Sequence, residues 1–240
     1  MMSQIDILAI GAHPDDVELS ASGTLLKHRA MGYTTGIIDL TQGELGSRGT
    51  KETRKEEAAA AARILGLTER VNLKMADGFF EHSEENLRLI IEQIRRFKPQ
   101  IVLLNAVSDR HPDHGRGGKL ASEACFLAGL RKIETTWNGE PQEAHRPQAV
   151  YHYVQDRYLQ PDFVVDVTDF VEQKFDSIKA YKTQFWDPNS TEPKTPISGE
   201  EFFEFLRGRM AEFGRNIGVR YAEGYTVERI IGVNSLFELR

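Results

Sequence analysis

The sequence is poor in cysteine and has no long apolar run, and each absence excludes a class of protein. Its single cysteine, Cys125, has no second cysteine with which to form an internal disulfide, and we expect it to be a small buried hydrophobic residue. No apolar stretch approaches the roughly 20 residues that a membrane-spanning helix requires. The N-terminus also lacks the pattern of a signal peptide. We therefore expect a cytoplasmic protein without a membrane partner.

The sequence also lacks a surplus of basic charge. Its 240 residues include 30 Lys and Arg against 36 Asp and Glu, a formal net charge of −6. Because proteins that bind nucleic acid need a net basic face, we expect no nucleic-acid partner. The 40% hydrophobic and 28% charged residues are typical of a globular protein. Neither a linker nor a repeat is apparent, so we expect residues 1–240 to form a single domain.

Short apolar segments alternate with helical patterns along the chain. The predicted strands span residues 5–12, 33–41, 70–76, 101–106, 149–154 and 163–167. The predicted helices span residues 51–66, 83–98, 170–185 and 200–213. Strands that are apolar almost throughout indicate a parallel sheet that is buried on both faces. The sequence therefore predicts a Rossmann-like, doubly wound α/β fold with a mostly parallel sheet and helices on both faces.

Two nucleotide-binding loops are absent, and polar motifs stand in their place. Neither G-x-G-x-x-G nor G-x-x-x-x-G-K-[ST] occurs, which disfavours a dinucleotide site and excludes a P-loop. The first strand ends instead in Ala12-His13-Pro14-Asp15-Asp16, and the strand at 101–106 is followed by His111-Pro112-Asp113-His114. In a doubly wound sheet these two strands are neighbours, and ligands bind beyond their carboxyl ends. We therefore expect the two motifs to face each other.

The residue types in these motifs suit a metal centre. His13, Asp16 and His114 offer two imidazoles and one carboxylate, which is a donor set for a catalytic zinc that keeps a position open for water. Fe(II) prefers the same donors, so the residues alone do not choose between these metals. For the adjacent carboxylates of Asp15 and Asp16, helix capping is the alternative interpretation.

Three further residues then acquire roles. Asp15 is the candidate general base, and His111 is the candidate donor to a developing oxyanion or leaving group. Asp113 is expected to orient one of the imidazole rings. A protein that only binds a metal or a sugar has no need of a spare carboxylate and a spare imidazole, which disfavours a non-catalytic function.

Both motifs resemble the hallmarks of the PIG-L/LmbE-like family of zinc-dependent N-acetylglucosamine (GlcNAc) deacetylases. This resemblance implies one zinc per chain, bound by His13, Asp16 and His114. It also implies Asp15 as the general base and His111 as the acid. A homo-oligomer, for example a hexamer, is a further implication, and the Phe-rich helix at 200–213 is a candidate contact surface.

Two other segments, residues 41–50 and 218–225, look most like the bacillithiol-biosynthesis deacetylases, which release acetate from N-acetylglucosaminyl-malate. Malate is dianionic, so we expect cationic side chains to meet it. The candidate substrate-binding residues are Ser47, Arg48, Arg54, Asp77 and Arg110. Among them Arg110 is the first choice for malate because it adjoins the metal loop, and Arg54 matches an arginine of the family. A chitooligosaccharide or another GlcNAc conjugate is the alternative amino-sugar substrate.

Overall fold

The computed structural model describes residues 4–239, so residues 1–3 and 240 of the predicted domain lie outside the described part. The strands are β1 (Ile7–Gly11), β2 (Thr35–Thr41), β3 (Glu69–Met75), β4 (Ile101–Leu104), β5 (Thr136–Trp137), β6 (Glu140–Pro141), β7 (Ala149–Tyr153), β8 (Phe163–Asp166) and β9 (Ala222–Val227). The α-helices are α1 (Asp16–Ser20), α2 (Ser22–Ala30), α3 (Lys51–Leu65), α4 (Glu84–Phe97), α5 (Pro112–Ala128), α6 (Val171–Lys179) and α7 (Glu201–Asn216). Two 3₁₀ helices, η1 (Thr168–Phe170) and η2 (Leu236–Glu238), complete the described elements.

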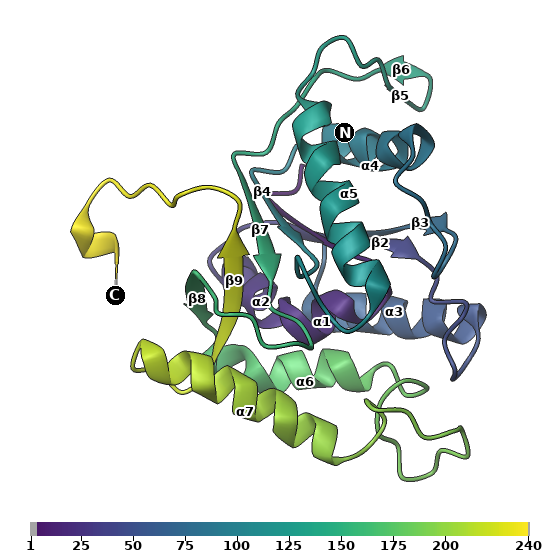
Figure 1. Ribbon diagram of the computed structural model, residues 1–240, viewed down its shortest axis with the longest axis vertical. Coiled ribbons are helices and arrows are strands. Elements are labelled where there is room, and N and C mark those ends of the chain that lie inside the picture. Colours follow the sequence, from purple (N-terminus) through teal and green to yellow (C-terminus); the bar gives the residue numbers. More distant parts are fainter. Residues whose placement is uncertain (1–3, 240) are drawn as a thin grey trace.

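A seven-stranded sheet in the order β3-β2-β1-β4-β7-β9-β8 forms the centre of the protein (Figure 1). The first five strands of this order pair in parallel, whereas β9 runs antiparallel to both β7 and β8. Helices cover both faces, which confirms the predicted Rossmann-like, mostly parallel α/β fold. The expected adjacency of the first strand and the strand after residue 100 is also confirmed, because β1 pairs with β4.

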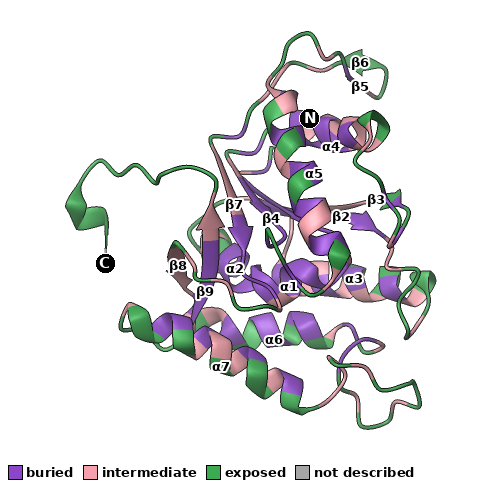
Figure 2. Cartoon of the chain, viewed as in Figure 1, coloured by how far each residue is buried: buried purple, intermediate pink, exposed green. Residues whose placement is uncertain are grey.

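Alternate side chains of β1 pack into two separate hydrophobic cores, one on each face of the sheet. Leu8 and Ile10 pack with α4 and α5 on one face of the sheet, and Ile7 and Ala9 pack with α1 and α2 on the other. All of these side chains are buried, as Figure 2 shows for the centre of the sheet. Full burial of each Leu or Ile contributes about 1.5–3 kcal/mol, so the central strand is firmly fixed between its two helical layers.

Local capping interactions define the ends of α3 and the start of α5. Thr50 caps α3 by accepting the backbone N–H of Thr53 at 3.2 Å, and the Thr53 hydroxyl in turn accepts the N–H of Thr50 at 2.8 Å. The helix ends at Gly66, which has a φ of 62°. Helix α5 begins with Pro112 at its first position, where a missing N–H costs nothing.

The structure differs from the predicted elements at the end of one helix and at strand β9. The helix predicted over 170–185 ends at Lys179, since the backbone N–H of Thr183 donates to Glu57 Oε1 at 2.7 Å instead of continuing the helix. Strand β9 was not predicted, because its pattern is broken by the charged Glu223 and by Gly224. The Glu223 carboxylate is buried and accepts a hydrogen bond from Lys174 Nζ at 2.7 Å, which makes a charged residue tolerable inside the sheet.

Cys125 lies on α5 and is buried in the hydrophobic core, as expected of a small hydrophobic residue. In the Phe-rich helix α7, Phe202 and Phe213 are buried whereas Phe205 is exposed. None of the helices between residues 4 and 239 combines the length and apolar character needed to cross a bilayer.

The burial of Cys125 predicts that its thiol is inert in the native protein. Burial raises the pKa of this thiol well above its ordinary value, so almost no reactive thiolate forms at pH 8. We expect no reaction with DTNB under native conditions and reaction of one thiol per chain after unfolding in guanidinium chloride. Rapid labelling of the native protein, at the rate of a free cysteine, would contradict this placement.

Candidate active site

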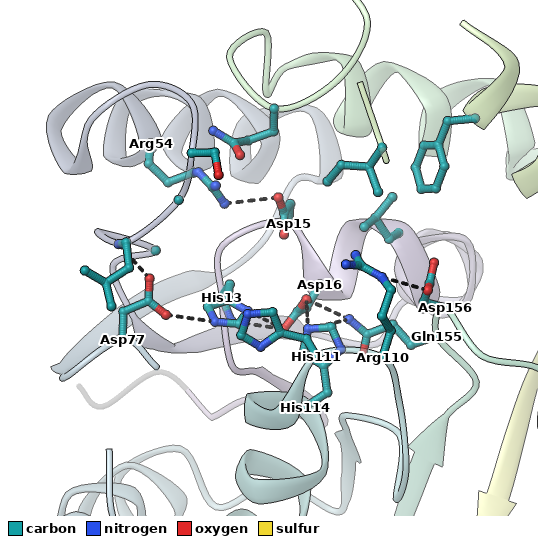
Figure 3. A pocket seen from close by; sticks show the side chains of 18 of the residues that line it. His13, Asp15, Asp16, Arg54, Asp77, Arg110, His111, His114, Gln155 and Asp156 are labelled. Carbon is teal, nitrogen blue, oxygen red and sulfur yellow. Dashed lines mark hydrogen bonds and ion pairs between the residues drawn. The ribbon is translucent and has the colours of Figure 1, made fainter. Parts of the chain in front are cut away.

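Parallel pairing of β1 with β4 brings the two polar motifs together at one edge of the sheet. The register runs from Ile7↔Ile101 to Ile10↔Leu104, so the chain leaves both strands at the same level. A cavity of about 320 Å³ opens there. It is lined by nine of the predicted site residues, several of which are labelled in Figure 3: His13, Asp15, Asp16, Ser47, Arg54, Asp77, Arg110, His111 and His114. Asp113 and Arg48 do not line it.

The three predicted metal ligands converge on the Asp16 carboxylate. His114 Nε2 lies 3.1 Å from Asp16 Oδ1, and His13 Nδ1 lies 3.6 Å from Asp16 Oδ2. Asp16 and His114 are buried, and the His13 side chain is 12% exposed. Two imidazoles and a carboxylate are donor types that a divalent metal ion such as zinc takes.

The ring nitrogens of His13 and His114 that face away from Asp16 contact other carboxylates. His114 Nδ1 lies 2.5 Å from Asp109 Oδ2, and His13 Nε2 lies 3.0 Å from Asp77 Oδ1 and 3.3 Å from Asp113 Oδ2. Such partners fix the tautomer and the orientation of a ligating histidine. Asp113 therefore lies where a residue that orients an imidazole should lie. Asp77, a candidate substrate-binding residue, faces His13 and accepts the backbone N–H of Leu45 at 2.9 Å.

Within the described residues, two sets of three side chains have donor atoms close enough to share one ion. The first consists of His13, His111 and His114, and the second of His13, Asp77 and Asp113. Neither set contains Asp16, so its role as a metal ligand stays a prediction. Both sets include His13, whose two ring nitrogens point to different groups. The second set offers a competing position for a cation on the Nε2 side of this ring.

The electrostatics of the cluster favour a cation. Burial alone would raise the pKa of Asp16, but the adjacent His114 and His13 rings hold it well below its ordinary value. Burial likewise disfavours a charged His114, yet Asp16 and Asp109 raise the pKa of this imidazole to about 9. The carboxylates thus attract positive charge to the position between the imidazoles, where a proton and a metal ion compete.

Asp15 occupies a strained and buried position beside the metal-ligand cluster. Its φ of 114° lies in a region that residues other than glycine rarely adopt. Arg54 Nη1 holds this conformation by donating to Asp15 Oδ2 at 3.0 Å and to the Pro14 carbonyl at 2.6 Å. Burial raises the pKa of Asp15 to about 7, although the charge of Arg54 opposes this shift. Arg54, expected to contact substrate, is thus already paired with Asp15.

His111 presents a proton donor to the cavity. Its Nδ1 accepts the backbone N–H of Asp113 at 3.3 Å, which places the ring proton on Nε2. The ring centroid lies 4.7 Å from that of His13 and 5.2 Å from that of His114. Burial, together with the charges of these two neighbours, lowers the pKa of His111. A neutral imidazole with its N–H toward the cavity can donate a hydrogen bond to an oxyanion.

Of the two remaining predicted arginines, Arg110 lines the cavity and Arg48 does not. Arg48 lies outside the cavity, because its Nη2 donates to Ser190 Oγ at 2.5 Å and its carbonyl accepts from Gln184 Nε2 at 2.8 Å. This position gives no support to the expected contact of Arg48 with substrate, which stays a prediction. Arg110 does line the cavity, and its Nε donates to Asp156 Oδ2 at 3.0 Å.

Two amide side chains that were not predicted from the sequence donate hydrogen bonds to the Asp16 carboxylate. Asn105 Nδ2 donates to Asp16 Oδ2 at 3.0 Å, and Gln155 Nε2 donates to Asp16 Oδ1 at 2.6 Å. Asn105 also donates to Gln155 Oε1 at 2.9 Å and accepts the N–H of Ala12 at 2.8 Å. A polar amide just after a buried strand was the available signal, since Asn105 follows β4 and Gln155 follows β7 closely.

The fold and this cluster define an open α/β protein with an imidazole and carboxylate donor set at the carboxyl edge of its sheet. Comparison with known proteins agrees with that class. Residues 8–125 match the PIG-L family, described as GlcNAc-PI de-N-acetylase. The chain is 30% identical over 229 residues to a diacetylchitobiose deacetylase of Thermococcus kodakarensis, which covers 91% of this chain and 81% of the relative. The chain belongs to the PIG-L, or LmbE-like, deacetylase family.

Three other known proteins are similar to this chain. The conserved protein TT1542 of Thermus thermophilus superposes with a TM-score of 0.85 at 35% identity, over 96% of this chain and 98% of that one. A 4-oxalmesaconate hydratase of Pseudomonas putida is 27% identical, over 75% of this chain and 74% of the relative. A probable N-acetyl-α-D-glucosaminyl L-malate deacetylase 2 of Bacillus anthracis is 24% identical, over 77% and 84% respectively.

The hydrogen bond from Gln155 to Asp16 predicts an effect on metal affinity. Replacement of Gln155 by Leu removes a donor that orients the carboxylate, and such changes typically weaken metal binding about 10–100-fold. We expect this loss in a zinc titration against a chromophoric chelator. Gln184→Leu is the matched control, because Gln184 also lines the cavity but donates to Arg48 and Thr183. Equal zinc affinity in the wild type and Gln155→Leu would refute the role of Gln155.

Proposed function

We propose that this chain hydrolyses the N-acetyl group of a GlcNAc conjugate, with N-acetylglucosaminyl-malate as the favoured substrate. In this proposal His13, Asp16 and His114 bind one zinc per chain, and Fe(II) is the alternative metal because it prefers the same donors. The observation that carries the proposal is Asp15. It is a buried carboxylate next to the donor set, its pKa is about 7, and the donor set is complete without it.

The proposed reaction assigns a step to each polar group. When bound, the metal ion polarises the acetamide carbonyl and acidifies water. Asp15 accepts a proton from the attacking water, whose oxygen adds to the acetamide carbon, and Arg54 holds the Asp15 carboxylate in place. His111 Nε2–H donates to the oxyanion. The C–N bond then breaks, the proton passes to the amino nitrogen, and acetate leaves.

The substrate assignment depends on cavity chemistry and on relatives. Arginine side chains in the cavity suit a conjugate that carries carboxylates, and one relative is named as a glucosaminyl-malate deacetylase. The diacetylchitobiose deacetylase among the relatives supports a chitooligosaccharide as the second candidate. A hydratase in the same family makes a direct assay of acetate release necessary.

Replacement of Asp15 by Asn tests the assignment of the base. The amide keeps the size of the side chain but cannot accept the proton, so acetate release from N-acetylglucosaminyl-malate should fall about 10²–10⁴-fold. Zinc content, measured by inductively coupled plasma mass spectrometry, should stay at the wild-type level. An Asp15→Asn protein with full zinc and wild-type turnover would remove Asp15 from the mechanism.

We also propose that the chain forms a homo-oligomer, with a hexamer as one candidate arrangement. Support comes from the C-terminal arm, residues 229–239, which extends away from the body of the protein (Figure 1). Three large apolar side chains on it are almost fully exposed: Ile230 at 94%, Leu236 at 81% and Phe237 at 100%. Apolar surface of this kind marks a protein contact, and a second copy of the chain is the proposed occupant.

Deletion of everything after Arg229 should then lower the molar mass measured by light scattering at micromolar concentration. We expect the full chain to exceed the monomer mass and the truncated chain to form smaller assemblies. Met31→Ser, which alters an exposed apolar residue far from the arm in sequence, is the control and should keep the assembly intact. A full-length chain of monomer mass would contradict the proposed oligomer.

A further inference from the structure

One wall of the cavity contains a cation that the sequence analysis did not consider. Helix α7 contributes Phe202, Leu206 and Arg209 to this wall, and Leu19 of α1 completes its apolar part. Arg209 is partly buried, and this burial lowers the pKa of its guanidinium. The charges of Asp156, Asp109 and Glu223 oppose this shift, but each of these carboxylates is paired with another side chain, namely Arg110, His114 and Lys174.

The charge of Arg209 is balanced by fewer hydrogen bonds and ion pairs than the charges of the other arginines of the cavity. Its one hydrogen bond among the described residues joins Nη1 to the Asp156 carbonyl at 3.3 Å. Arg54 is paired with Asp15 at 3.0 Å, and Arg110 with Asp156 at 3.0 Å, whereas Arg209 forms no ion pair with any described carboxylate. Since a guanidinium has five N–H donors, most of those on Arg209 are available to a ligand.

The surroundings of Arg209 favour an anionic ligand. Arg209 donates to the backbone carbonyl of Asp156, and Arg110 donates to the side chain of the same residue, so both guanidinium groups bind Asp156. The three side chains together carry one net positive charge, because Arg110 neutralises the Asp156 carboxylate. Apolar walls exclude water and strengthen the attraction between a guanidinium and an anion.

We propose that Arg209 is a specificity-determining residue that binds a carboxylate on the part of the substrate other than the acetamide. This inference rests on the proposed deacetylase function and narrows its substrate class to conjugates with an acidic substituent. A guanidinium binds a carboxylate through two parallel hydrogen bonds, which gives orientation as well as affinity. The apolar side chains of Phe202 and Leu206 then contact the carbon atoms that bear the carboxylate.

Kinetics with an acidic and a neutral substrate test this inference. Arg209→Met keeps the apolar stem and removes the charge. Its kcat/KM for N-acetylglucosaminyl-malate should fall about 10–100-fold, chiefly through KM, as expected for loss of a charged hydrogen bond. Its kcat/KM for neutral diacetylchitobiose should stay within about twofold of wild type. Arg209→Lys should recover part of the loss.

Arg207→Met is the matched control on the same helix. Arg207 is paired with Glu172 at 3.0 Å and does not line the cavity, so both substrates should be processed as by wild type. An equal loss on both substrates in Arg209→Met would show a structural role and overturn the inference. No change on either substrate would overturn it as well.

Binding of malate alone separates this inference from the proposed function. If the wild type releases no acetate from either substrate, the deacetylase proposal fails, but the anion site can still be measured by calorimetry. Malate that binds the wild type and Arg207→Met, with at least tenfold weaker binding to Arg209→Met, supports the site. Equal malate binding by all three proteins, or none by the wild type, overturns it.

Discussion

Parallel pairing of β1 with β4 is the interaction on which the candidate active site depends. The two strands lie 94 positions apart in the chain at Ile7 and Ile101, yet their register places both polar motifs at one level of the sheet. Asn105 reinforces the pairing beyond the end of β4, because its side chain accepts the N–H of Ala12. A shift of one residue in this register would turn one set of side chains away from the other.

The cluster that results concentrates negative charge around two imidazoles. Four carboxylates contact the rings of His13 and His114: Asp16, Asp77, Asp109 and Asp113. In such surroundings positive charge is stabilised, whether as a proton on an imidazole or as a divalent cation between the rings. Asp15 differs from these four because its partner is Arg54 and its backbone is strained. The same short motif thus contains one carboxylate that contacts the two imidazoles and another, paired with Arg54, that we propose as the proton acceptor.

The sequence predicted the parts of this arrangement that depend on local patterns. Apolar runs with helical segments between them indicated a parallel sheet, and two dense groups of His and Asp after its strands indicated the cluster. Pairings between distant residues could not be predicted. Gln155 reaches Asp16 across 139 positions, and Arg54 forms its ion pair with Asp15 across 39 positions. Arg110 was therefore assigned by its proximity in sequence to the metal loop and Arg54 by its match to the family, whereas Arg209, on a late helix, was missed.

The central claim is that His13, Asp16 and His114 share one metal ion. An anomalous difference map at the zinc absorption edge, from crystals of the zinc-loaded protein, tests it most directly. The account predicts one peak per chain with His13 Nδ1, His114 Nε2 and an Asp16 oxygen at about 2.0–2.2 Å. A peak on the other side of the ring, between His13 Nε2, Asp77 and Asp113, or no peak at all, would contradict it.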